Sequence, residues 1–262
     1  MTTNQAFTIL SNIAGAHTAR IITDAIPNMS RPMLWRISRQ LRRGMPVAKI
    51  IHNKWFYGLK FYTNKHTLDP RPDTETLVEC VINDYKRAKH INIADLGTGT
   101  GCIICAIAKN IEASGTALEK SRSAIRVAKK NIQSLNLNDK ISLIHGDFTN
   151  PNALPKNTFD VIVSNPPYIA VGDKRVDIGA MHDPKMALFA KNNGLAAYEQ
   201  IAKNAKYWLK DRGRIYLEIG INMQDDVTQI FTNQNWKFIN SATDLGGTVR
   251  VLIFENINKN YE

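Results

Sequence analysis

The sequence predicts an α/β fold, a Rossmann-like doubly wound sheet of seven strands, and two observations lead to this prediction. From residue 91 onward, short apolar segments alternate with longer amphipathic ones, which is typical of parallel strands joined by helices that cover both faces of the sheet. The first apolar segment, 91–96, runs directly into a glycine-rich turn and then an apolar helix, as in folds that bind nucleotide-like ligands.

The individual elements follow from the apolar pattern along the chain. No helical pattern separates the last two strands, so we expect the final strand to insert antiparallel at the edge of the sheet. Strands are expected at 91–96, 116–119, 141–145, 159–164, 214–219, 236–240 and 249–254, and helices after the glycine turn, at 121–135 and around 195–209.

A small helical unit is expected before the sheet. Residues 1–48 are predicted to form short helices interrupted at Pro27, Pro32 and Pro46. This segment is also strongly basic. It forms the first of three predicted domains.

A linker with a β-hairpin is expected next, over residues 49–72, because aromatic and polar side chains alternate around Gly58. The linker ends in the rigid connector Pro70-Arg71-Pro72. The main domain then spans 73–262, and Asp73 is expected to cap its first helix.

Composition limits the class of protein. The 262 residues are 44% hydrophobic, as in ordinary soluble globular proteins, and can bury a sizeable core. The longest apolar stretches, such as 102–108, are far too short to span a bilayer. No secretory signal is visible, and three cysteines make no disulfide framework, so cytoplasm is the expected location.

The net charge of +11 is the unusual bulk property. It attracts polyanions, which makes contact with nucleic acid or with an acidic protein surface plausible. A solvated basic face and an Arg-rich mitochondrial presequence, which would place the protein in the mitochondrial matrix, are the alternatives. Over the first sixty positions only Asp24 opposes Arg20, Arg31, Arg36, Arg39, Arg42, Arg43, Lys49, Lys54 and Lys60.

The strand at 159–164 is followed by the tetrapeptide Asn165-Pro166-Pro167-Tyr168. Proline has a fixed φ and no N–H, so this loop is stiff and rich in acceptors. The Asn165 side-chain oxygen and the Pro166 carbonyl can together accept both hydrogens of a planar NH₂ group, on an amide or a nucleobase, and aim its nitrogen at a methyl donor. The alternative is a turn that only terminates the strand.

The glycine turn after 91–96 suits S-adenosylmethionine better than a dinucleotide. A dinucleotide fingerprint would place Gly or Ala where Cys102 stands. Glu119, at the end of the second strand, can accept hydrogen bonds from both ribose hydroxyls, and Phe148 offers a flat apolar surface to adenine. Another nucleotide, or a plain tight turn, is the alternative. The candidate cofactor-binding residues are Gly97, Thr98, Gly99, Thr100, Gly101, Glu119, Phe148 and Asn165.

Other candidate groups favour structural roles. Cys102 and Cys105 have metal or redox spacing but lie on the apolar helix, so core packing is expected. The six histidines show no ligand spacing, and no metal site is predicted. Packing of the hairpin is favoured over a role as substrate-pocket floor for Tyr57, Phe61 and Tyr62.

Arg71 and Thr74 have two open interpretations. They can face the methionine end of the cofactor, or they can serve as a surface charge and a helix cap.

The ordered motifs resemble those of the release-factor glutamine methyltransferases, the HemK/PrmC group, over residues from about 42 to 254. The resemblance implies a class I S-adenosylmethionine-dependent methyltransferase fold. It also implies methyl transfer to the side-chain amide nitrogen of the glutamine in the Gly-Gly-Gln motif of class 1 peptide release factors. The matching stretches are Pro70 to Glu75, Asp95 to Gly101, Asn165 to Ile169, Ala187 to Phe189, Leu217 to Gly220, and Asp244 to Gly247 with Arg250-Val251.

By this resemblance Asn165, Pro166 and Tyr168 are the catalytic residues, and Pro167 joins them in binding substrate. Tyr168 is expected to pack against the planar amide. No acid or base with a shifted pKa is expected to be needed before transfer.

Three departures from the family pattern stand out. The resemblance implies that residues 1–48 dock the protein substrate, but the segment before Arg42 is shorter than the helical domain with which the family does so. The family's aromatic-Glu-Pro is His182-Asp183-Pro184 here, and Glu119 replaces the commoner Asp.

Rival functions share the same loop. An amino-methyltransferase acting on a base amine of RNA or DNA would need base flipping and a recognition module, and the chain has no long insertion for one. A ribosomal-protein glutamine is a closer variant. A non-catalytic adaptor that docks on ribosomes or RNA is a third possibility.

Overall fold

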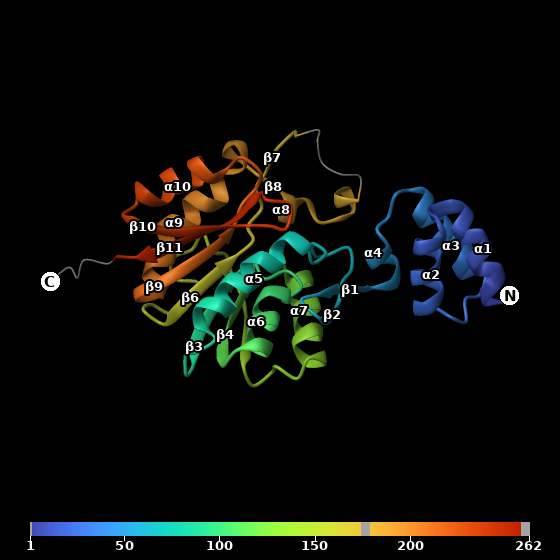
Figure 1. The fold of residues 1–262 in the computed structure, drawn as a ribbon, viewed down its shortest axis with the longest axis horizontal. Coiled ribbons are helices and arrows are strands. Elements are labelled where there is room, and N and C mark those ends of the chain that lie inside the picture. Colours follow the sequence, from blue (N-terminus) through green and yellow to red (C-terminus); the bar gives the residue numbers. More distant parts are fainter. Residues whose placement is uncertain (1, 174–178, 258–262) are drawn as a thin grey trace.

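The computed structural model describes residues 2–173 and 179–257. The outer ends of the predicted first and last domains, residue 1 and residues 258–262, lie outside the described residues. Four helices, a hairpin and a seven-stranded sheet with its covering helices follow one another along the chain (Figure 1). Among the described residues, no helix has the length and apolar character needed to cross a membrane.

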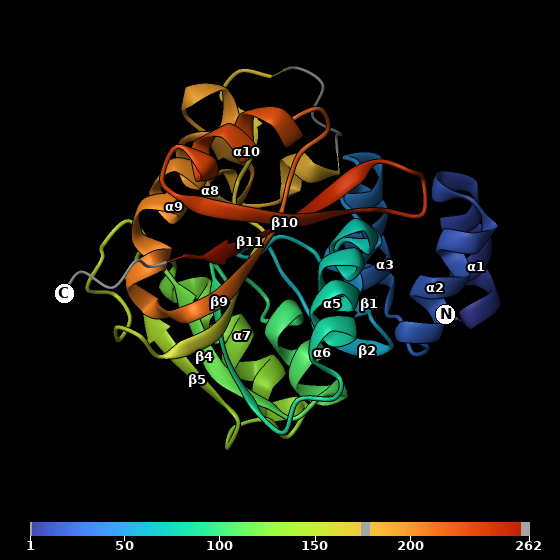
Figure 2. The same ribbon diagram turned by 60° about the vertical axis from the view of Figure 1, so that its left-hand side comes forward.

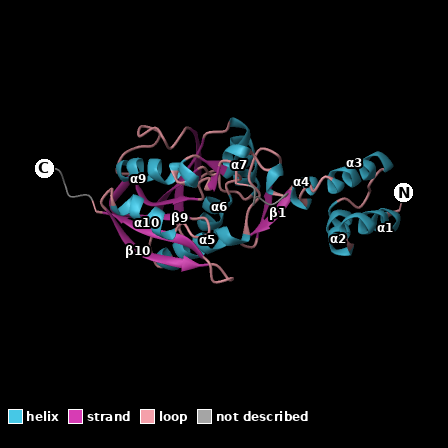
Figure 3. Ribbon diagram, turned by 90° about the horizontal axis from the view of Figure 1, so that it is seen from above, coloured by secondary structure: helices cyan, strands magenta, loops and turns pink. Residues whose placement is uncertain are grey.

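The N-terminal helices are α1 (Thr3–Ala14), α2 (Ala16–Ala25), α3 (Arg31–Arg42) and α4 (Val47–Ile51). They surround a small core of their own, which includes Leu10, Ile22 and Ile37, and α1 to α3 lie at one end of the molecule, apart from the sheet (Figure 3). Pro27 and Pro46 lie between helices as predicted. Pro32 does not interrupt a helix, because it occupies the first turn of α3, where its missing N–H leaves no bond unmade.

The predicted hairpin is confirmed as β1 (Asn53–Phe56) and β2 (Leu59–Tyr62), which pair antiparallel. Its two-residue turn, Tyr57-Gly58, has positive φ at both positions, 48° and 72°, which matches the twist of a hairpin. The Asn131 side chain joins this hairpin to the main domain, because it accepts from the Tyr62 N–H at 2.7 Å and donates to the Tyr62 carbonyl at 2.9 Å.

The main sheet has the strand order β10-β11-β9-β6-β3-β4-β5. Its first five strands in the chain run parallel, whereas β11 is antiparallel to both neighbours. The strands are β3 (Ile91–Leu96), β4 (Ala113–Glu119), β5 (Ile141–His145), β6 (Phe159–Ser164), β9 (Leu209–Glu218), β10 (Trp236–Thr243) and β11 (Val249–Asn256), and a two-stranded pair is formed by β7 (Ile169–Ala170) and β8 (Phe189–Ala190).

The predicted edge position of the last strand is wrong. β11 inserts between β9 and β10, and β10 forms the edge. Buried side chains alternate on β11, with Val251 facing one core and Leu252 and Phe254 the other, as an interior strand requires.

Helices cover both faces of the sheet (Figure 2). One apolar core lies under α5 (Pro72–Tyr85), α6 (Cys102–Asn110) and α7 (Arg122–Ser134). The other lies under α9 (Ala196–Trp208) and α10 (Gln224–Thr232). The sequence analysis did not anticipate α10. The remaining short helices are α8 (Lys185–Leu188) and two 3₁₀ turns, η1 (Ala180–His182) and η2 (Asn192–Gly194).

Two details of these helices bear on the predictions. Asp73 does not cap α5: the helix begins at Pro72, and Arg71 is the N-cap residue. Cys102 and Cys105 are buried in the core beneath α6, so their predicted packing role is confirmed.

The order in which strands are added to the sheet changes side between β3 and β6. β4 and β5 follow β3 on one side, and β6 and β9 lie on the other. Open α/β sheets bind ligands at such a switch point, outside the carboxyl ends of the strands. The glycine turn follows β3 and Asn165 follows β6, so both predicted motifs meet there.

Candidate active site

A cavity of about 320 Å³ lies at this edge of the sheet. It brings together most of the predicted residues, from the ends of β3, β4, β5 and β6. Gly101 and Tyr168 are outside the lining. The predicted residues in the lining are Gly97, Thr98, Gly99, Thr100, Glu119, Phe148, Asn165, Pro166 and Pro167.

The glycine turn leaves its backbone open to a ligand. Gly97 and Gly99 have φ values of 74° and 57°, which disfavour other residues. A Cβ at Gly97 would have no atom within 4 Å, and one at Gly99 would meet only the Gly97 carbonyl oxygen, at 3.9 Å. Side chains here would therefore enter the cavity. Gly101 is instead the N-cap residue of α6, where a Cβ would contact Ala128 at 3.6 Å.

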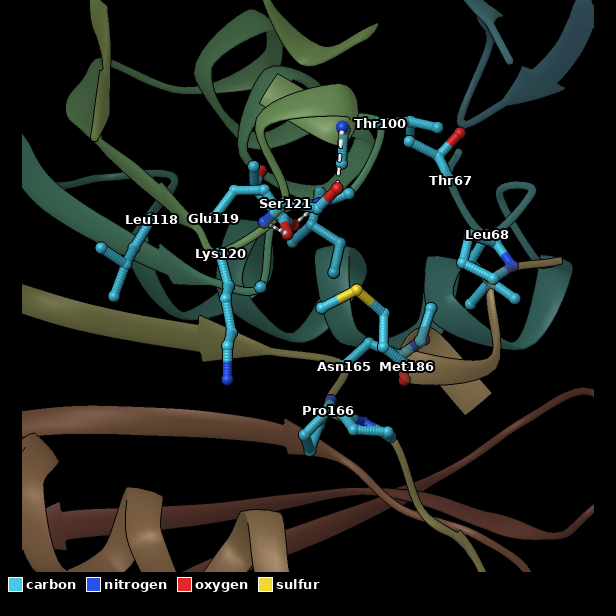
Figure 4. A pocket seen from close by; sticks show the side chains of 18 of the residues that line it. Thr67, Leu68, Thr100, Leu118, Glu119, Lys120, Ser121, Asn165, Pro166 and Met186 are labelled. Atoms are coloured by element: carbon cyan, nitrogen blue, oxygen red, sulfur yellow. Dashed lines mark hydrogen bonds between the residues drawn. The ribbon is translucent and has the colours of Figure 1, made fainter. Parts of the chain in front are cut away.

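The Glu119 carboxylate is held in place by backbone N–H groups. Its two oxygens accept from Gly99 at 3.0 Å and from Ser121 at 2.8 Å. Each carboxylate oxygen has a further lone pair available. Glu119 lies across the cavity from Asn165, Pro166 and Met186 (Figure 4), so a ligand that fills the cavity spans the two sides.

Asp95 lies buried beneath the turn, outside the cavity lining. One oxygen accepts from the Thr98 hydroxyl at 2.6 Å. Burial raises the pKa of Asp95 to about 7. The bond to Thr98 braces the turn from below.

Asp147 and Phe148, which follow β5, both line the cavity. Lys120 pairs with Asp147 at 2.7 Å, and the Phe148 carbonyl accepts from Asn204 at 2.9 Å. Phe148 is partly buried against the core under α9, so its position is fixed.

Asn165 stands at the head of a chain of polar side chains. Its Nδ2 donates to Thr74 Oγ1 at 3.1 Å, and the Thr74 hydroxyl donates to Glu218 Oε2 at 2.5 Å. The Tyr168 hydroxyl donates to the other oxygen of Glu218 at 3.4 Å. Burial raises the pKa of Glu218 to about 7. Sequence reasoning assigned Glu218 no role, although it lies in one of the family-like motifs.

Tyr168 packs behind the cavity. Its ring lies against Gly220, where a Cβ would approach Cδ2 to 3.0 Å. Its carbonyl lies against Gly194, where a Cβ would come within 2.1 Å of the oxygen. Positions 194 and 220 therefore require glycine, and the packing of Tyr168 against them holds the loop that follows Asn165.

Arg71 and Thr74 both line the cavity. Thr74 makes no helix cap, because its hydroxyl is bonded within the site and α5 has no side-chain cap. Arg71 donates to Asp183 Oδ2 at 2.7 Å, next to the cavity-lining Pro184.

The aromatic residues of the hairpin do not line the cavity. Phe61 is buried against Phe56, and Tyr57 packs against the same core. Tyr62 stacks on His52 and lies under the Lys130 ammonium. The expectation that they pack the hairpin is confirmed.

The fold and this site define a class I methyltransferase that uses S-adenosylmethionine. Residues 65–182 match the methyltransferase small domain. Among solved structures, a methyltransferase from Pyrococcus furiosus is 19% identical with a TM-score of 0.57, covering 85% of this chain and 98% of that one. The hMettl16 catalytic domain in complex with MAT2A 3′UTR hairpin 6 is 18% identical, with a TM-score of 0.61 over 78% of this chain and 77% of that one. Both similarities concern the fold.

The chain belongs to the release factor glutamine methyltransferase family. The family member from Caulobacter vibrioides is 33% identical over 94% of this chain and 86% of its own. That from Agrobacterium fabrum is 37% identical over 84% and 78%. A bifunctional methyltransferase from Rickettsia typhi is 40% identical over 82% of this chain but only 45% of its own, so this chain spans less than half the length of that relative.

Proposed function

We propose that this protein transfers a methyl group from S-adenosylmethionine to the glutamine side-chain nitrogen in the Gly-Gly-Gln motif of class 1 peptide release factors. One observation supports this most directly: Asn165 and Pro166 line the same cavity as the glycine turn. An NH₂ group held by Asn165 and Pro166 would thus lie beside a cofactor held by the glycine turn. The names of the family relatives point to the same substrate.

The cavity suits the cofactor. Gly97 to Thr100 would follow its methionine end, Glu119 would accept from the ribose hydroxyls, and Phe148 would flank the adenine. When bound, S-adenosylmethionine supplies an electrophilic methyl group. The protein itself would bind and orient the two reactants.

Amide nitrogen is a poor nucleophile because its lone pair is delocalised into the carbonyl. The Asn165 oxygen and the Pro166 carbonyl would each accept one amide hydrogen, orient the nitrogen and favour the partial positive charge that develops on it. Most of the acceleration then comes from alignment and electrostatics. Pro167 and Tyr168 would keep the loop in shape, and Tyr168 acts from behind the cavity.

We assign residues 1–48 to docking of the protein substrate, 49–72 to the linker and 73–262 to methyl transfer. The exposed basic residues of α3 fit an acidic protein surface. They are Arg31, Arg36, Arg39 and Arg42. Release factors act on ribosomes, so cytoplasm is the compartment we propose.

A second candidate is methylation of a base amine in RNA or DNA. One observation favours it: Trp35 on α3 is 65% exposed, and Arg39 lies over its ring. Aromatic and arginine side chains together are typical of single-strand binding. We expect nucleic acid to be at most a contact of this segment, rather than the preferred substrate.

One assay separates the two. The protein is incubated with methyl-labelled S-adenosylmethionine and, separately, with release factor, a release factor whose Gly-Gly-Gln glutamine is alanine, ribosomal RNA and DNA. Label is expected on the first substrate alone. Label on nucleic acid, or retained on the alanine variant, would overturn the proposal.

A further inference from the structure

A chain of buried polar groups runs from Asn165 through Thr74 to Glu218. We propose that Thr74 and Glu218 are positioning residues that turn the Asn165 amide so that its oxygen, Oδ1, faces the methyl acceptor. Only the identity of that acceptor, a glutamine amide, rests on the function proposed above.

The orientation of this amide decides whether the site can hold an NH₂ group. The oxygen and nitrogen of an asparagine side chain are nearly equal in size, and rotation by 180° exchanges them. With Oδ1 outward, Asn165 accepts a hydrogen from the substrate. With Nδ2 outward, two donors would face each other, and the substrate nitrogen would be repelled.

The bonding pattern leaves one orientation. An ionised carboxylate accepts hydrogen bonds and cannot donate, and a hydroxyl has a single hydrogen. Thr74 must therefore donate to Glu218, 2.5 Å away, and can only accept from Asn165. Asn165 then presents Nδ2 to Thr74, which leaves Oδ1 on the other branch of the amide.

Glu218 is 1% exposed. The Tyr168 hydroxyl donates to Oε1 at 3.4 Å, and the Tyr198 hydroxyl donates to the Glu218 backbone carbonyl at 2.8 Å. Among charged groups, Asp73 on α5 opposes its ionisation and Arg250 on β11 favours it. A further titratable neighbour, the Cys102 thiol, is buried with its pKa raised to about 12 and stays neutral.

This arrangement makes transfer sensitive to pH. Burial raises the pKa of Glu218 to about 7, so the carboxyl gains a proton within the neutral range. A protonated Glu218 can donate to Thr74, which frees the Thr74 hydrogen for Asn165 Oδ1 and permits the wrong orientation. We expect kcat to fall as the pH drops below about 7.

Substitution of Thr74 is the first test. Thr74→Val removes the hydroxyl at nearly constant shape and is expected to lower kcat roughly 10- to 100-fold, as loss of a supporting hydrogen bond commonly does. Thr74→Ser should restore most of it. The matched control is Thr116→Val on β4, whose hydroxyl bonds Ser142 away from the cavity.

Because Thr74 lines the cavity, cofactor affinity is measured in parallel by calorimetry. It is expected to stay within about twofold in Thr74→Val, which places the loss in turnover. Wild-type kcat in Thr74→Val would overturn the proposal, and so would a loss wholly explained by weaker cofactor binding.

Glu218→Gln gives a second readout. Glutamine can accept from Thr74 but does not titrate, so activity should remain measurable and the loss of kcat below pH 7 should disappear. If kcat of Glu218→Gln still falls below pH 7 as in the wild type, the proposed role of this carboxyl is contradicted.

A substrate-free measurement separates failure of this inference from failure of the proposed function. In protein labelled with ¹⁵N at asparagine, the Asn165 side-chain NH₂, identified by its absence in Asn165→Ala, should exchange slowly with solvent in the wild type and faster in Thr74→Val. Equal exchange rates would overturn the positioning role. If release factor is not methylated but the exchange difference is present, the proposed substrate is wrong and the positioning role stands.

Discussion

Lys49 Nζ and Asp183 Oδ1 lie 2.8 Å apart, with only 3% and 1% of their side chains exposed. Lys49 also lies 2.8 Å from Asp69, and Asp183 lies 2.7 Å from Arg71. This buried cluster ties helix α4 to the segment that leads into Pro184 at the cavity rim. The departure at His182-Asp183-Pro184 therefore has a structural role here.

Removal of the lysine from this cluster should destabilise the protein. Lys49→Met removes the cation that pairs with both Asp69 and Asp183, and only the pair of Asp183 with Arg71 is left in this cluster. Breaking a buried ion pair costs about 3–5 kcal/mol. Denaturant unfolding should show this loss, whereas Lys60→Met, at an exposed position on β2, should change stability by less than about 0.5 kcal/mol. A loss below about 1 kcal/mol for Lys49→Met would be inconsistent with this prediction.

Gly99→Val should strongly weaken cofactor binding. The residue has positive φ, and its side chain would enter the cavity. Gly58→Val is the matched control, since Gly58 also has positive φ and open space but lies in the hairpin turn. Both variants should lose about 1–2 kcal/mol of stability from backbone strain. Calorimetry should show weak cofactor binding in Gly99→Val alone, and equal affinities would mean that the turn is misassigned.

Asn165→Ala should lose turnover and keep the cofactor. Removal of one electrostatic contact made in the transition state lowers kcat by roughly 10²- to 10³-fold. Cofactor affinity should be nearly unchanged, because the glycine turn and Glu119 remain. Single-turnover rates and calorimetry on the same preparation check both parts, and a variant with normal kcat would remove Asn165 from the mechanism.

The free energy of unfolding should fall as the pH rises, because the buried carboxyl of Glu218 must ionise. Its pKa is about 7 in the folded protein against an ordinary value of 4.5, so the native state holds its proton over a range where the unfolded state has lost it. The stability contributed by this group is complete below pH 4.5 and is lost as the pH rises through 7. Each pKa unit corresponds to about 1.4 kcal/mol, so the total is about 3 kcal/mol.

The direction of this pH dependence is checked by measuring the free energy of unfolding of Glu218→Gln and of the wild type at several pH values. The variant should gain stability relative to wild type between pH 5 and pH 8. A constant difference would show that Glu218 titrates normally in the folded state.

Local sequence determined much of the sheet. β3, β5 and β6 match their predicted bounds because each is a short segment rich in apolar, β-branched residues between polar or turn residues. Helix α10 escaped prediction because its nine residues carry only two buried side chains. The place of β11 could not be read from the chain, since strand order depends on which distant strands pair.

The residues of the candidate site likewise fall into those that the sequence predicts and those that it does not. The glycine turn, Glu119 and Asn165 could be predicted because each directly follows or ends a strand, and parallel strands bring their carboxyl ends to one edge. The partners of these residues could not: Thr74 and Glu218 are 144 positions apart. Backbone conformation depends on neighbours along the chain, but a hydrogen bond between such distant residues exists only after helix α5 has packed beside β9.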